Sequence, residues 1–115
     1  MAIKYQPQEG IKYMTHGLKK HLIELSDILY LECDDHLITI HLINQTQIFE
    51  IFSLCQFETY YGCYGFIRIS NNMLINLKYA TGIIEKNGQK YLFLGQIELK
   101  ISRRKRRNIT NYNEI

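Results

Sequence analysis

Short apolar runs separated by turn-forming residues are the feature of this sequence that most constrains its fold. Apolar side chains alternate with polar ones in residues 38–42, and "IFEIF" at residues 48–52 is expected to continue this strand pattern. Alternation with a period of two is typical of half-buried strands, because successive side chains point to opposite faces of a sheet. We expect further strands around Leu25, Ile28 and Tyr30, at residues 66–69, and from residue 81 onward. The sequence therefore predicts a mostly-β chain.

Turn signals divide these runs. Asn87 and Gly88 lie between "GIIE" and "KYLFL". An Asn-Gly pair in this position favours a tight hairpin, because both central residues of the turn need positive φ. Residues 94–97 predict a second reversal into "IELKIS", so the C-terminal half is expected to hold a meander of at least three strands. Earlier turns are expected at Asp34–Asp35 and at "NQTQ", residues 44–47.

One segment has a helical pattern instead. In "SLCQFETYYG", Ser53 is a good N-cap, Leu54, Phe57 and Tyr61 have helical spacing, and Gly62 ends the pattern. We expect a short helix there. Residues 70–76, "SNNMLIN", predict a loop with one helical turn.

Composition indicates one folded domain. The chain has 115 residues with a single Pro and seven Gly, which leaves no low-complexity linker. No apolar run is long enough to span a bilayer, and the first residues lack the apolar core of a secretory signal. Three cysteines, an odd number, are expected to be reduced and partly buried. The expected location is the cytoplasm, with no membrane partner.

The positive charge is concentrated in one segment. The net charge is only +3, but residues 103–107 read "RRKRR". Without this run, 9 basic residues face 11 acidic ones. Such a cluster is typical of a polyanion-binding protein, and a solvated basic tail is the alternative. Because Arg103 and Arg104 follow a strand expected to turn Ile97, Leu99 and Ile101 inward, a packed strand would position them.

No catalytic motif is present. The sequence has no GxSxG, no phosphate-binding glycine loop and no HExxH. Cys33, His36 and His41 make only a weak metal-ligand set, because structural zinc sites usually show two paired clusters. Tyr60, Tyr61 and Tyr64 could stack bases, although such residues more often pack in a core. We therefore expect no enzyme activity, no metal and no cofactor.

Three motifs, in this order, carry a family resemblance. They are "DILYLE", "FIRISNNMLINL" and "ISRR". Together they resemble the LytTR-type DNA-binding domain, the output module of many bacterial response regulators in two-component systems. The likeness covers residues 17–109, with 1–16 as an N-terminal extension and 110–115 as a tail. It implies a compact, mostly-β domain of about ten short strands in small antiparallel sheets, with one or two short helices.

The resemblance also implies a function, sequence-specific binding of double-stranded DNA in transcription regulation. Loops and strand ends would enter successive major grooves. Arg can pair with guanine and Asn with adenine, while neighbouring polar and basic side chains hold phosphates. Carried over by position, the DNA contacts would be His36, Ser70, Asn71, Asn72, Ser102, Arg103 and Arg104, with Lys78, Lys105 and Arg107. Of these, Asn72, Ser102, Lys105 and Arg107 are expected at phosphates, and Lys78 is expected to join them.

This chain departs from the family pattern. Many members have His, a basic residue, Ser and an aromatic where it has Ser70, Asn71, Asn72 and Met73, so no target sequence can be carried over. Many members also carry an upstream receiver domain, for which the first 16 residues are too few. The chain is thus expected to be a one-domain regulator or a fragment. Members usually bind direct repeats, which implies a second copy on DNA. A protein-interaction module with only non-specific polyanion binding remains the alternative.

Overall fold

The computed structural model describes residues 13–16 and 21–110. Most of the expected N-terminal extension and C-terminal tail, residues 1–12 and 111–115, lies outside the described residues. Within them the chain forms ten strands, two α-helices and several 3-10 turns. The strands are β1 (Tyr13–His16), β2 (His21–Glu24), β3 (Ile28–Asp34), β4 (Leu37–Leu42), β5 (Gln47–Ile51), β6 (Phe66–Ser70), β7 (Met73–Asn76), β8 (Gly82–Lys86), β9 (Gln89–Leu94) and β10 (Ile97–Ile101). The helices are α1 (Leu54–Tyr61) and α2 (Arg106–Thr110).

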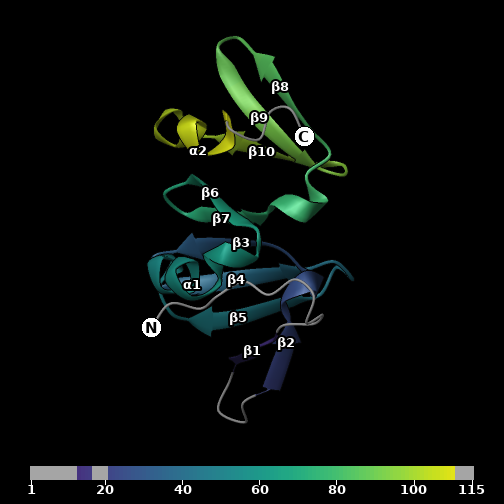
Figure 1. The fold of residues 1–115 in the computed structure, drawn as a ribbon, viewed down its shortest axis with the longest axis vertical. Coiled ribbons are helices and arrows are strands. Elements are labelled where there is room, and N and C mark those ends of the chain that lie inside the picture. Colours follow the sequence, from purple (N-terminus) through teal and green to yellow (C-terminus); the bar gives the residue numbers. More distant parts are fainter. Residues whose placement is uncertain (1–12, 17–20, 111–115) are drawn as a thin grey trace.

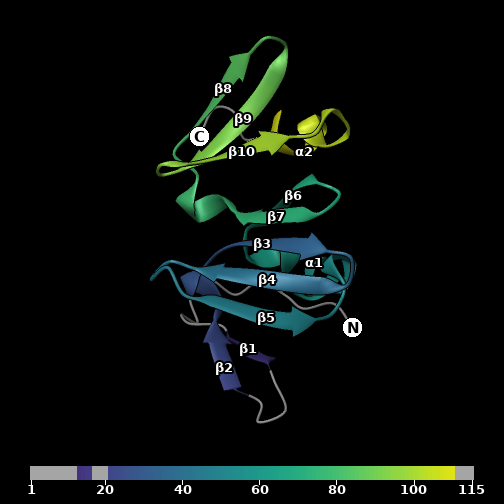
Figure 2. The same cartoon turned by 180° about the vertical axis from the view of Figure 1, so that it is seen from behind.

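The strands form three antiparallel sheets along the long axis of the molecule (Figure 1). A five-stranded sheet has the order β5-β4-β3-β7-β6, a three-stranded sheet has the order β10-β9-β8, and β1 pairs with β2. The five-stranded sheet lies between the other two (Figure 2). The predicted mostly-β fold of small antiparallel sheets with two short helices is thus confirmed.

Two apolar cores hold the sheets together. The first packs Leu54 and Phe57 of α1 against the five-stranded sheet. The second lies between the β6–β7 hairpin and the three-stranded sheet and contains the fully buried Ile69 and Ile101. The β6–β7 hairpin contributes to both cores, so its strands are covered on both faces. The hairpin therefore joins the two halves of the described fold.

Local signals in the sequence are confirmed where they predict the helix and the tight hairpins. Ser53 caps α1 by accepting a 2.9 Å hydrogen bond from the amide of Gln56. Asn87 and Gly88 have φ of 53° and 77°, as the β8–β9 turn requires, and Gly95 has φ of 64° between β9 and β10.

The prediction for residues 70–76 is wrong in part. Met73–Asn76 is the strand β7, and the 3-10 turn follows it at Leu77–Tyr79. Leu74 and Ile75 are consecutive and both buried, because β7 lies between β3 and β6 with both faces covered. A strand buried on both faces has no polar alternation, so the periodicity did not reveal it.

Several smaller expectations also need correction. The first turn lies at Asp35 and His36, since Asp34 still belongs to β3 and Asp35 has φ of 61°. Leu25 belongs to a 3-10 turn. Ile97 is 37% exposed at the start of β10, which is an edge strand of its sheet. The three cysteines form no disulfide in the described residues, and Cys33 is half-buried as expected, but Cys55 and Cys63 are exposed.

Candidate nucleic-acid interface

Three polar elements reach the same long edge of the molecule. They are the β3–β4 turn, the β6–β7 turn and the 3-10 turn Arg103–Lys105 after β10. Figure 1 shows them in this order from lower to upper left, and Figure 2 shows them on the right. The sequence-predicted contacts in these elements therefore face one side.

The β6–β7 turn presents two exposed amides with different surroundings. The Ser70 hydroxyl donates a 2.7 Å hydrogen bond to Asn72 Oδ1, and the Cys33 amide donates a 2.8 Å bond to the Asn72 carbonyl. In the described part of the chain, the side chain of Asn71 makes no hydrogen bond. Asn71 is therefore the amide that is free to bind a partner, while Asn72 is already engaged.

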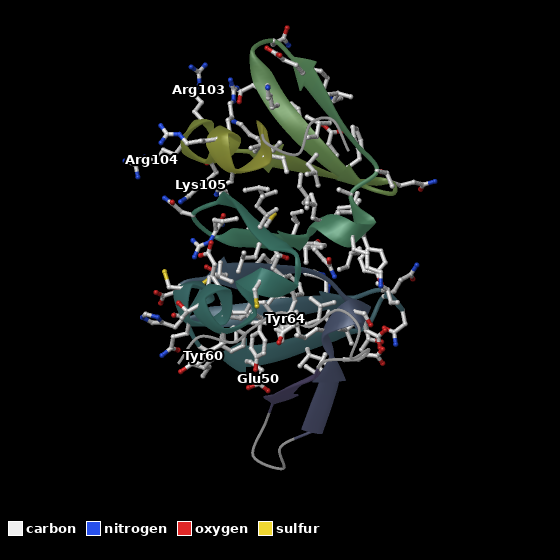
Figure 3. All side chains as sticks on the ribbon, in the orientation of Figure 1. Glu50, Tyr60, Tyr64, Arg103, Arg104 and Lys105 are labelled. Atoms are coloured by element: carbon white, nitrogen blue, oxygen red, sulfur yellow. The ribbon has the colours of Figure 1, made fainter. Side chains whose placement is uncertain are left out.

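The basic run is folded and anchored. Ser102 directly follows β10, and its hydroxyl accepts a 3.2 Å hydrogen bond from the Lys105 amide, which caps the 3-10 turn. Helix α2 follows at once and buries Ile109 completely in the second core. Arg103 and Arg104 are exposed, and Figure 3 shows them with Lys105 projecting from this edge. The solvated-tail alternative does not describe this segment.

Arg106 differs from its basic neighbours. It is half-buried, and its Nη2 donates a hydrogen bond to the carbonyl of Gly88 in the β8–β9 turn. Arg106 therefore ties α2 to that hairpin, whereas Arg107 is exposed. Arg106 is not among the predicted DNA contacts, and its position agrees with a structural role.

An open groove of about 570 Å³ brings two of the predicted loops together. Its lining includes Ser70 and Asn72 from one loop and Ser102 and Arg103 from the other, and Met73 at the start of β7. Gln89 and Lys100, which the sequence analysis missed, also line it. Side chains alternate along β10, so Lys100 points to the face opposite the buried Leu99 and Ile101. This alternation could have predicted an exposed lysine next to the basic run.

Four of the ten predicted contacts line the groove, and of the other six, His36 and Lys78 lie on elements that contribute no residue to it. His36 is at the lower end of the same edge, with its side chain 86% exposed and Nε2 3.8 Å from the Asp35 carboxylate. Lys78 follows β7 at the end away from Asn72, with Nζ 5.4 Å from the centre of the Tyr79 ring. Its DNA contact stays a prediction, and the geometry does not bring it to the groove.

The described residues offer little other chemistry. No group of three His, Cys, Asp or Glu side chains among them could hold a metal ion. No helix in residues 13–16 and 21–110 is both long and apolar enough to cross a membrane.

These features define a mostly-β domain with one cationic, amide-bearing edge. The family model of the LytTr DNA-binding domain matches residues 19–113, and this chain belongs to that family. It is a family of DNA-binding domains and not of catalytic ones, so membership supports DNA binding in transcription regulation. The resemblance found in the sequence is thereby confirmed.

A solved structure shares the fold. It is described as the LytTr DNA-binding domain of a methyl-accepting/DNA response regulator from Bacillus cereus. The two chains are 15% identical with a TM-score of 0.67, and the match covers 90% of this chain and 94% of that one. None of the curated proteins compared with this chain matches it.

Proposed function

We propose that this chain binds double-stranded DNA sequence-specifically and regulates transcription in the bacterial cytoplasm. Its long edge would contact successive major grooves through the β3–β4 turn, the β6–β7 turn and the segment after β10. The observation that carries the proposal is the groove shared by Ser70, Asn72, Ser102 and Arg103, since these residues come from two loops thirty residues apart.

The dimensions of the molecule support this mode of binding. The Cα atoms extend 46 Å along the long axis. Major grooves on one face of B-DNA recur about every 34–36 Å. The long axis of the molecule therefore exceeds the spacing of two successive grooves, and the three DNA-facing elements lie along part of it.

The surroundings of each side chain suggest its role. Asn71, whose amide is unengaged, would pair with adenine, and Arg103 and Arg104 with guanine. Phosphates would be held by Asn72, Ser102, Lys100, Lys105 and Arg107. His36 would make the contact at the lower end of the edge. The proposal requires no cofactor, and direct-repeat sites would hold a second copy.

Selection from a pool of random duplexes tests the proposal. We expect a recurring motif, and competition with a scrambled duplex should show a clear preference for it. About five neutralised phosphates predict a log–log salt slope of about −4 to −5. Selected duplexes that bind no better than random DNA, even at low salt, would contradict sequence-specific binding.

The alternative function also has a structural observation in its favour. Phe49 and Ile51 on the edge strand β5 are exposed, and Leu37 lies opposite Ile51 on β4. Exposed apolar residues that cluster in this way are typical of protein interaction surfaces. Failure to recover a DNA motif, together with a salt-dependent but sequence-independent affinity, would favour a protein-interaction module.

A further inference from the structure

A buried arginine lies directly beneath the β6–β7 turn. Arg68 of β6 is only 8% exposed. Its Nη1 donates a 2.8 Å hydrogen bond to the carbonyl of Asn71. Its Nη2 donates a 3.0 Å bond to Glu58 Oε1 on α1 and lies 3.6 Å from the Cys55 thiol. The guanidinium therefore connects helix α1 to the residue whose amide is free at the interface.

Burial of the Arg68 guanidinium carries a desolvation cost. Its Nε is buried and has no hydrogen-bond partner among the described residues. A buried charge with an unsatisfied donor contributes little net stability compared with an apolar side chain of similar size. The particular contribution of Arg68 is geometric, because its rigid fork binds Glu58 and the Asn71 carbonyl at the same time.

The backbone around Arg68 also holds the basic segment. Asn108 of α2 donates a 2.9 Å hydrogen bond from Nδ2 to the Arg68 carbonyl. The next residue, Ile69, accepts a 2.8 Å bond from the amide of Ser102. The two elements that line the groove are thus attached to the same two residues of β6, one through a side chain and the other through carbonyls.

We propose that Arg68 is a positioning residue of the DNA interface. It fixes the Asn71 carbonyl and so sets the direction in which the Asn71 amide meets a base. Arg68 does not touch DNA itself, because it is buried behind the turn. This inference rests on the proposed function of the turn.

Arg68→Lys is the informative variant. It keeps the positive charge but cannot bind both partners with one planar group. We expect it to reduce the preference for the selected duplex over random DNA by as much as Asn71→Ala, about 5- to 150-fold, the range for one base contact. The salt slope should stay unchanged. Glu58→Gln is the matched control. It weakens the link to α1 but keeps an acceptor for Arg68 Nη2, and it leaves the hydrogen bond to the Asn71 carbonyl in place. The preference for the selected duplex should therefore be retained.

The double variant separates positioning from general destabilisation. If Arg68 acts through Asn71, Arg68→Lys should have little further effect on the preference of the Asn71→Ala protein. Additive losses would overturn the inference, because they indicate independent roles. A salt slope that falls by about one would also overturn it, since Arg68 would then contact a phosphate.

The protein without DNA supplies a second readout. Backbone NMR order parameters at Asn71 and Asn72 should be about 0.85 in the original protein and fall below about 0.6 with Arg68→Lys. An unchanged turn would contradict the positioning role even where DNA preference falls. If the unsubstituted protein shows no sequence preference, the proposed function fails and the inference fails with it. Full preference in Arg68→Lys overturns the inference alone.

Discussion

The backbone amide of Ser102 donates a 2.8 Å hydrogen bond to the carbonyl of Ile69. The last strand therefore ends against β6, and the arginines that follow are held beside the Asn71–Asn72 turn. Two short polar segments that are far apart in the sequence become one surface through this contact.

Arg104→Ala and Arg107→Ala should separate base contacts from phosphate contacts. Both arginines are exposed in the basic segment. We expect Arg104→Ala to weaken binding to the selected duplex by roughly 1–3 kcal/mol and to relax specificity at one base pair. Arg107→Ala should weaken all duplexes alike and flatten the salt slope by about one. Identical behaviour of the two variants on selected and random DNA would contradict this division.

Lys100→Ala tests the part of the groove that the sequence analysis missed. Lys100 lines the groove and is exposed, so its loss should flatten the salt slope by about 0.9, as expected for one phosphate. Lys78→Ala tests the predicted contact outside the groove and should flatten the slope less, because Lys78 lies at the far end of β7. Binding titrations at several salt concentrations measure both. A larger slope change for Lys78 than for Lys100 would place DNA on another face.

Ile109→Ala should release the basic segment from the core. Ile109 is fully buried in the second core, so its truncation should lower the free energy of unfolding by about 2–5 kcal/mol. Preference for the selected duplex should fall as well, while binding to random DNA should fall less. Ile84→Ala, at an exposed position on β8, should change stability by no more than about 0.5 kcal/mol. Denaturant unfolding and competition binding report the two effects, and unchanged preference in a folded Ile109→Ala protein would count against the anchor.

Stability should fall at high pH in part through Tyr61. Burial raises the pKa of Tyr61 above its ordinary value of 10.0, and the neighbouring Tyr60 and Tyr64 add to the shift. The fold therefore favours the neutral phenol. This contribution is fully present below pH 10 and is lost as the pH rises through the higher pKa of the folded state. Tyr61→Phe should make the stability less dependent on pH in this alkaline range, as chemical unfolding at several pH values would show. An equally steep loss in both proteins would mean that other groups cause it.

Features set by neighbouring residues could be predicted from the sequence, and features set by distant pairing could not. The Asn87–Gly88 hairpin and the Ser53-capped helix depend on local backbone requirements and local hydrogen bonds. The strand β7 depends on β3 and β6 covering both of its faces, which no local pattern shows.

The same distinction applies to the candidate site. The sequence motifs identified the two polar loops as candidate DNA contacts. The groove between these loops depends on the hydrogen bond between Ser102 and Ile69, which no local pattern reveals. Five consecutive cations are compatible with a tail. What makes them a helical segment is the burial of Ile109, whose partners come from other parts of the chain.

Amide chemical-shift mapping with a selected duplex tests whether DNA binds along this edge. We expect the largest changes at Asn71, Lys100, Arg103 and Arg104, with a smaller group at His36. The outer face of β5 around Phe49 and Ile51 should change little. Large changes on that face, with no change at Asn71 and Arg104, would show that DNA does not bind along the proposed edge.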